Sequence, residues 1–228
     1  KAIGLVAADA VLPPLSLVPV EANNAIANGY SGKPNPAWES LPADRREDLA
    51  RRMATFAAMV EHVDQGVGRL LADLEQHGEL ANTLIVFTSD NGACYEWGPF
   101  GFDGVSRSGQ NDLHVGESLA GMGQAGTHSS YGSAWANLGN TPLNLYKHFC
   151  NEGGISSPLI VSWPATLKPS VAWIRSSAHV MDFLPTIAAA AGATYPAERA
   201  GKPILPASGR SLLPALRGEA TPERGIPT

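Results

Sequence analysis

Hydrophobic residues recur with a helical period in the segment that follows Pro42. They lie three or four positions apart and comprise Leu49, Met53, Phe56, Val60, Val63, Val67, Leu70 and Leu74. Residues at this spacing share one face of an α-helix, so the pattern predicts one long amphipathic helix. We expect Gly78 to end it, because glycine readily takes the left-handed conformation that follows many helices.

The polar face of this predicted helix carries a cluster of charged residues. The cluster comprises Arg45, Arg46, Asp48, Arg51, Arg52 and Glu61. Charges distributed along one face of a long helix usually remain in water. We therefore expect the cluster to form solvated surface and not a binding site.

Two short apolar runs predict strands. Residues 83–89 (TLIVFTS) are continuous and rich in β-branched residues, which is typical of a strand buried on both faces in a parallel sheet. Residues 158–163 (PLIVSW) predict a second buried strand. A long helix that leads into such a strand indicates an α/β architecture.

The remaining segments predict the domain organisation. Residues 21–41 favour irregular structure, and residues 93–146 form a Gly-, Ser- and Asn-rich stretch so long that we expect a functional loop region. Asp182 is expected to cap a helix that begins near Pro185 and ends at Gly192. We therefore predict one domain over residues 1–192 and the start of a smaller domain over residues 193–228.

Composition removes several classes of partner. The 228 residues include 16 basic and 21 acidic side chains, and the basic residues are scattered, so nucleic acid is not an expected partner. No apolar run approaches the roughly 20 residues that span a bilayer, so a membrane is not expected either. Cys94 and Cys150 have neither C-x-x-C nor zinc-type spacing and are expected to be free thiols, which leaves the compartment open.

Polar side chains come directly after the first predicted strand, in the tripeptide Asp90-Asn91-Gly92. Ligands of α/β sheets bind at the carboxyl ends of strands. A carboxylate and a neighbouring amide carbonyl supply two oxygen ligands of the kind that a hard divalent cation prefers, and Gly92 allows a sharp turn. The tripeptide alone leaves a plain Asn-Gly turn open as the alternative.

Several separated segments, taken together, resemble the sulfatase family. TLIVFTSDNG is similar to the strand and metal-binding turn of that family, and YKHFCNEGGISSPLIVSWPA is similar to its lysine and E-G-G segment. The resemblance covers most of residues 50–218 in the family's order, and YGSAWANLGNTPLNLYKH further resembles the bacterial arylsulfatases. Three more segments agree with the family: MVEHVDQGVGRLLADLEQHGELANT, HVMDFLPTIAAAAG and GRSLLPALRG.

The resemblance implies an alkaline-phosphatase-like α/β fold with a central sheet, a calcium ion, and hydrolysis of small-molecule sulfate esters. Asp90 and Asn91 match the family's second pair of calcium ligands, and Lys147 matches its lysine that contacts the sulfate and the leaving oxygen. The chemistry is consistent, because an ammonium near the departing oxygen stabilises the negative charge that develops there. The segment Glu152-Gly153-Gly154 is expected to be architectural, since glycine permits close backbone approaches.

Aromatic and histidine side chains near the two site segments are candidates for lining a pocket that receives an aromatic leaving group. Each is at least as well explained by packing. The candidates are His128, Tyr131, Trp135 and His148.

The nucleophile that the resemblance implies is not in this sequence. A sulfatase uses a formylglycine made from Cys or Ser in a C/S-x-P-x-R motif, and no Cys or Ser here lies in such a motif. We expect the formylglycine to lie upstream of Lys1, in a missing N-terminal half of the same protein. We therefore expect this chain alone to be inactive. A phosphomonoester or phosphonate hydrolase of the same superfamily, or a non-catalytic fragment, remain the alternatives.

Overall fold

The structure is a computed structural model that describes residues 7–12, 35–96, 98–105, 110–168, 173–174 and 176–219. Most of the irregular segment predicted at residues 21–41 lies outside the described residues, as do residues 220–228. The chain divides into two compact units. The first comprises Lys1–Gly68 and Asn91–Pro158, and the second comprises Arg69–Asp90 and Leu159–Thr228.

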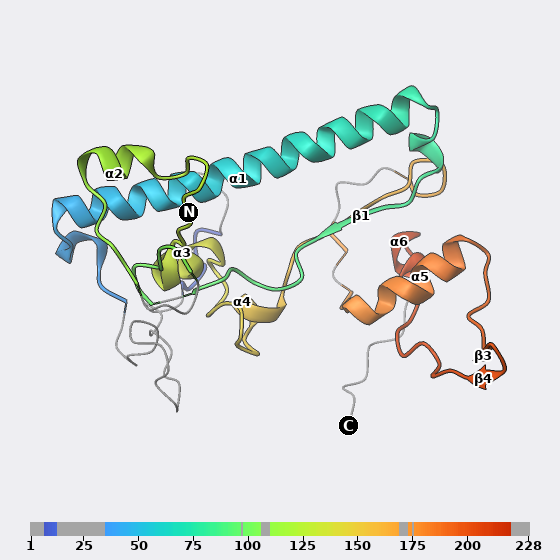
Figure 1. Cartoon of the computed structure of the whole chain (residues 1–228). Coiled ribbons are helices and arrows are strands. Elements are labelled where there is room, and N and C mark those ends of the chain that lie inside the picture. Colours follow the sequence, from blue (N-terminus) through green and yellow to red (C-terminus); the bar gives the residue numbers. More distant parts are fainter. Residues whose placement is uncertain are drawn as a thin grey trace. The chain divides into compact units, whose positions relative to one another are not determined.

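The predicted long helix is confirmed. Helix α1 spans Ala43–Gln76 (Figure 1), and Gly78 follows it with a φ of 73°. Its apolar stripe is buried only near the start: Leu49 is 3% exposed, whereas Val60, Val63 and Leu70 are more than half exposed. Val67 and Leu74 are half-buried, so the later part of the stripe is only partly covered by the described residues.

The prediction of a solvated charge cluster is wrong for two of its members. Asp48 and Arg52 are buried, at 0% and 2% exposure. The Arg52 guanidinium donates from Nε to Asp48 (3.2 Å) and from Nη2 to both carboxylate oxygens of Asp103 (2.9 and 2.7 Å). It also donates to the backbone carbonyls of Phe102 and Ser130. Asp48 is a neighbour on the same helix, but Asp103 and the two carbonyls lie 50 to 78 residues later, and a local pattern does not reveal such partners.

The first unit has a small aromatic core formed by residues of the predicted loop region. Tyr95, Ala136 and Tyr146 are buried together, and the rings of Tyr95 and Tyr146 stack 5.1 Å apart. Ala136 lies on helix α3 (Gly132–Gly139). The predicted loop region thus contains α3 and also helix α2 (Gly116–Gly121), and the short helix α4 (Glu152–Ile155) follows it. The 3-10 turn η1 (Trp38–Ser40) precedes α1.

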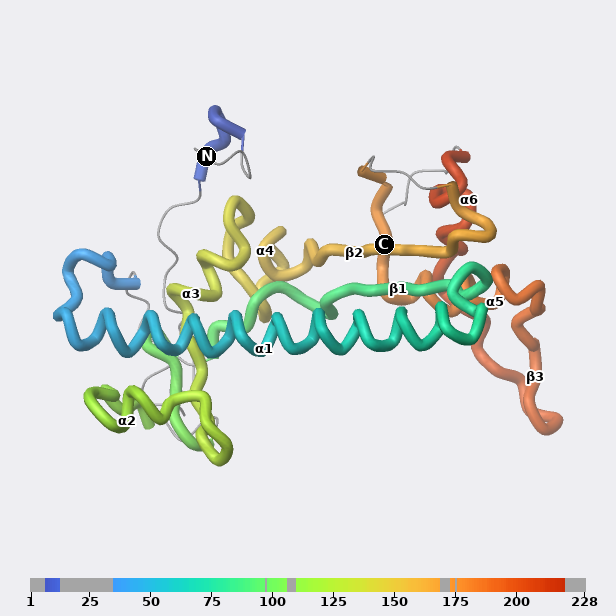
Figure 2. Tube along the Cα trace, turned by 90° about the horizontal axis from the view of Figure 1, so that it is seen from above, coloured from blue at the N-terminus to red at the C-terminus, as the bar shows by residue number. Residues whose placement is uncertain are grey.

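Both predicted strands exist in the second unit, but the expected parallel pairing is wrong. Strand β1 (Ile85–Thr88) follows the 3-10 turn η2 (Leu80–Asn82) and pairs with β2 (Leu159–Ser162) in an antiparallel register, Ile85 opposite Ser162. The two strands run side by side in Figure 2. Burial on both faces is wrong too, since Phe87 and Ile160 are 45% and 61% exposed. Hydrophobic composition reports how well a strand suits burial, while the direction of its partner depends on residues distant in sequence.

The second unit also holds the helix predicted after Asp182. Helix α5 (Phe183–Ala190) follows the 3-10 turn η3 (Val180–Asp182), so it begins two residues before Pro185. The Asp182 carboxylate accepts hydrogen bonds from the backbone N–H groups of His179 and Arg210, and so ties the start of α5 to a segment 28 residues later. The remaining elements are strands β3 (Glu198–Arg199) and β4 (Lys202–Pro203), which pair antiparallel, and helix α6 (Leu213–Leu216).

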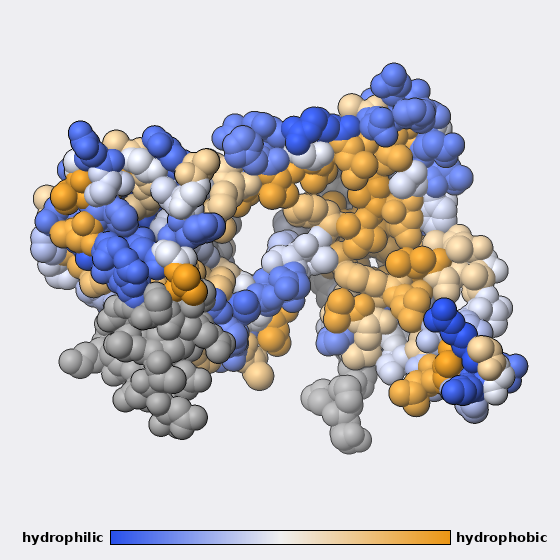
Figure 3. Space-filling view, in the orientation of Figure 1, coloured by the Kyte–Doolittle hydropathy of each residue, from blue (hydrophilic) through white to orange (hydrophobic). Residues whose placement is uncertain are grey.

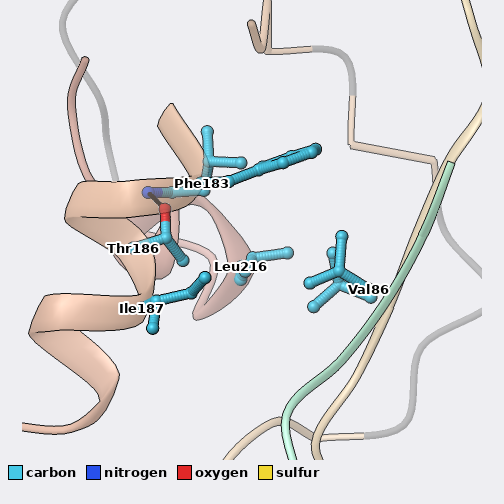
Figure 4. A pocket seen from close by; sticks show the side chains of 7 residues that line it. Val86, Phe183, Thr186, Ile187 and Leu216 are labelled. Carbon is cyan, nitrogen blue, oxygen red and sulfur yellow. Dashed lines mark hydrogen bonds between the residues drawn. The ribbon is translucent and has the colours of Figure 1, made fainter. Parts of the chain in front are cut away.

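A small apolar pocket lies where β1, β2, α5 and α6 meet. In Figure 4 the side chains of Phe183, Ile187 and Leu216 lie across from Val86. The Thr186 hydroxyl does not add a free polar group there, because it donates to the carbonyl of Asp182 and accepts from the N–H of Leu212. The full lining is Val86, Val161, Phe183, Thr186, Ile187, Leu212 and Leu216.

The described residues combine helices with two two-stranded antiparallel sheets, which fits an α/β chain. The central sheet and the division into residues 1–192 and 193–228 stay predictions. No helix in the described ranges is long and apolar enough to cross a membrane.

Candidate functional site

The Asp90-Asn91-Gly92 turn begins two residues after the end of β1, as the sequence predicts. Asp90 is exposed and is the last residue of its stretch in the second unit, and Asn91 and Gly92 are half-buried in the first unit. The Gly92 N–H donates to the carbonyl of Gly154 at 2.9 Å. A Cβ at Gly92 would overlap the carbonyl oxygen of Gly153, so only glycine lets the turn approach the E-G-G segment this closely.

The two glycines of the E-G-G segment permit close backbone packing, as predicted. Gly153 and Gly154 are buried in α4, and a Cβ on either would overlap backbone carbonyls from the preceding loop, those of Leu145 and Phe149 among them. The Gly153 N–H donates to the carbonyl of Asn144 at 2.9 Å. The two glycines therefore let α4 pack directly on the backbone that carries Lys147.

Lys147 is held next to the turn through its backbone. Its N–H donates to the carbonyl of Ala93 at 3.0 Å, one residue after Gly92. Leu145 and His148, on either side, have φ values of 62° and 79°. Non-glycine residues rarely adopt this left-handed conformation, and where they do the surrounding structure must enforce it. The structure thus brings the lysine segment and the Asn91-Gly92 part of the turn together.

The side chain of Lys147 is partly exposed and only weakly paired. It is 35% exposed, and its Nζ lies 3.9 Å from a carboxylate oxygen of Glu96. That oxygen also lies 3.3 Å from Nε2 of His148. A partly exposed ion pair at this separation contributes little to stability, so Glu96 holds the ammonium only weakly. The sequence did not indicate that Glu96 lies beside Lys147.

The four candidate pocket residues lie in different surroundings. His128 is exposed. Tyr131 packs on Phe56 with ring centroids 4.7 Å apart, and burial raises its pKa to about 12. Trp135 donates from Nε1 to the carbonyl of Leu49 and packs against Trp38. Packing therefore explains Tyr131 and Trp135, while His148 alone of the four lies beside Lys147.

The cysteine nearest to the site is a poor nucleophile. Cys94 and Cys150 are both free, as expected. Burial raises the pKa of Cys94, and the nearby Glu96 carboxylate acts in the same direction and outweighs the opposing effect of Lys147. Thiolate is the reactive form, so Cys94 is suited to packing.

The residues of this chain fit part of a calcium site. Asp90 and Asn91 offer a carboxylate and an amide carbonyl, the oxygen ligands that Ca²⁺ prefers, but the ion takes six to eight of them. No group of three or more His, Cys, Asp or Glu side chains in the described part of the chain is arranged to hold a metal ion. The donor chemistry fits and the number of donors does not complete a shell.

Comparison with known proteins identifies the family. The model of the Sulfatase family matches residues 18–193. This chain belongs to the sulfatase family. The match contains the D-N-G turn, Lys147 and the E-G-G segment within one family domain.

Individual sulfatases agree with that assignment. An uncharacterized sulfatase of Schizosaccharomyces pombe is 34% identical over 81% of this chain and 32% of its own length. An arylsulfatase of Klebsiella aerogenes is 31% identical over 93% of this chain and 41% of its own length, and a steryl-sulfatase of Mus musculus is 34% identical over 72% and 20%. The chain therefore spans well under half of the length of these sulfatases.

Proposed function

We propose that this chain is part of a sulfuric ester hydrolase of the arylsulfatase type. In this proposal Asp90 and Asn91 are ligands of a calcium ion, and Lys147 contacts the sulfate group and the leaving oxygen. The observation that carries it is the pair of backbone hydrogen bonds, Gly92 to Gly154 and Lys147 to Ala93, which hold the Asn91-Gly92 part of the turn against the lysine segment.

The role of Lys147 follows from its charge and its accessibility. Cleavage of the S–O bond leaves negative charge on the departing oxygen, and an ammonium already in place stabilises that charge more in the transition state than in the ground state. Lysine suits this role because its charge is compact and lies at the end of a long flexible stem. The weak contact with Glu96 keeps the ammonium near the site without neutralising it tightly.

Calcium, when bound, supplies positive charge that offsets the charge of the sulfate. Asp90 and Asn91 would hold it with one carboxylate and one amide oxygen. Their adjacent positions in the turn and the glycine that follows them support this assignment.

We further propose that the remaining ligands and the formylglycine come from a part of the sulfatase outside this chain, upstream of Lys1. Two observations support a part of the sulfatase outside this chain. The chain spans 32% and 41% of the length of two of its relatives. Apolar side chains are also exposed around β1 and α5 in the second unit, where Figure 3 shows a hydrophobic surface, and they include Val86, Phe87, Ile160 and Ile187. Surface of this kind usually has a partner.

The test is an assay of the full-length protein that contains this chain, with 4-nitrocatechol sulfate and 4-nitrophenyl phosphate as substrates. We expect calcium-dependent hydrolysis of the sulfate ester, loss of activity with a chelator, and recovery when calcium is returned. Faster hydrolysis of the phosphate ester would favour the phosphomonoesterase alternative. Absence of both activities, with calcium supplied, would favour the alternative of a non-catalytic protein.

A further inference from the structure

The Asn140 carboxamide connects three backbone segments of the site. Asn140 follows helix α3 directly and is half-buried. Its Oδ1 accepts from the N–H of Ala93 at 3.1 Å, and its Nδ2 donates to the carbonyls of Leu145 (2.9 Å) and Gly153 (2.7 Å). One side chain therefore joins the segment after the D-N-G turn, the loop before Lys147, and the E-G-G segment.

The segments that Asn140 connects include a backbone conformation that needs support from its surroundings. Leu145 has a left-handed backbone conformation that its own side chain disfavours, and it lies two residues before Lys147. Ala93, the other end of the Asn140 bridge, is also the residue whose carbonyl accepts from the Lys147 N–H at 3.0 Å. Ala93 thus contacts Asn140 through its N–H and Lys147 through its carbonyl.

We propose that Asn140 is a positioning residue that sets the distance between Asn91 and Lys147. Asn91 is two residues before Ala93, and Lys147 is two residues after Leu145, so the carboxamide fixes both from one point. No shorter side chain reaches all three groups, and aspartate cannot donate from the Nδ2 position. The inference deepens the proposed function and rests on it only where activity is the readout.

The experiment compares Asn140→Ala and Asn140→Asp with wild type in the full-length protein. Asn137→Ala is the matched control, because Asn137 lies on the same helix and its buried Oδ1 has no hydrogen-bond partner among the described residues. The readouts are kcat and KM for 4-nitrocatechol sulfate, and hydrogen exchange at the amides of Ala93 and Lys147.

We expect kcat to fall by roughly 10²-fold in both Asn140 variants, the loss that misplacement of a reacting group by about 1 Å can cause, with a much smaller change in KM. Exchange at Ala93 should accelerate in Asn140→Ala. The deficit of Asn140→Asp should shrink as pH falls, because a protonated carboxyl can again donate one hydrogen bond to a carbonyl. Asn137→Ala should match wild type in every readout.

Wild-type kcat in both Asn140 variants would overturn the proposal, and so would equal losses in Asn137→Ala. If Asn140→Ala does not fold, Asn140→Asp decides the matter through its pH profile, which a purely structural role would not produce. If wild-type protein hydrolyses no sulfate ester, the proposed function fails. The exchange rates at Ala93 and Lys147 then decide the positioning role independently, and unchanged protection in Asn140→Ala would reject it.

Discussion

Lys147 is the side chain on which the proposed chemistry depends most directly. Lys147→Ala in the full-length protein should lower kcat by roughly 10²–10³, as loss of an oxyanion-hole donor does. Thermal unfolding should change little, because the side chain is partly exposed and its ion pair with Glu96 is long. Lys168→Ala, at an exposed lysine of the second unit, is the control and should leave kcat unchanged.

A series of substituted phenyl sulfates separates this role from a structural one. Poorer leaving groups build more charge on the departing oxygen, so kcat of Lys147→Ala should fall more steeply with the pKa of the leaving phenol than wild-type kcat does. Parallel slopes, or a loss of activity that follows unfolding, would make Lys147 an ordinary surface lysine.

Asp103 stabilises the first unit through the buried Arg52. Burial raises the pKa of Asp103, but hydrogen bonds from Arg52 and from the Asp112 N–H outweigh it, so the pKa lies below its ordinary value of 3.8. Asp103→Asn leaves Arg52 with a buried charge short of one partner, which should lower the free energy of unfolding by about 3–5 kcal/mol at neutral pH. The control Asp73→Asn, at an exposed carboxylate on α1, should cost less than about 0.5 kcal/mol.

The pH dependence of that difference follows from the direction of the pKa shift. A carboxylate whose pKa is lowered in the folded protein contributes its stability above the unfolded pKa and loses it as pH falls through the folded pKa. Urea unfolding of wild type and Asp103→Asn should therefore differ most above pH 4 and converge below it. A difference that stays constant down to pH 3 would mean that Asp103 acts by packing alone.

The contact between the D-N-G turn and α4 depends on the glycines at their interface. Gly92→Ala would force backbone to move, because its Cβ would overlap the carbonyl of Gly153. Overpacking of this kind costs about 1–3 kcal/mol of stability, and here it should also lower calcium affinity. Gly121→Ala in α2 is the control, since a Cβ there meets no described atom within 4 Å. Equal unfolding midpoints and equal calcium titrations for the two variants would contradict this prediction.

The exposed apolar surface predicts how the chain behaves when it is produced alone. Phe87 and Ile160 on the paired strands are 45% and 61% exposed, and a two-stranded sheet is rarely stable by itself. Residues 1–228 should therefore bind an apolar dye such as ANS, bind calcium weakly, and hydrolyse no aryl sulfate. The full-length protein should bind much less dye per molecule. Turnover by residues 1–228 would refute an upstream nucleophile.

Local patterns in the chain were enough to predict the long helix, both strands, the position of the D-N-G turn and the architectural role of the glycines. The period of α1 and the β-branched run of β1 are short-range features that each segment carries alone. The same holds for the family, because its motifs are short and ordered along the sequence.

Long-range contacts decided the rest. The Arg52 guanidinium is buried where Asp103, 51 residues later, pairs with it. The antiparallel direction of β1 is set by its pairing with β2. Asn140 joins residues 47 positions before it and 13 after it. Hydrophobic period and residue type do not encode which distant groups meet, since that depends on how the whole chain closes its backbone hydrogen bonds and buries its charges.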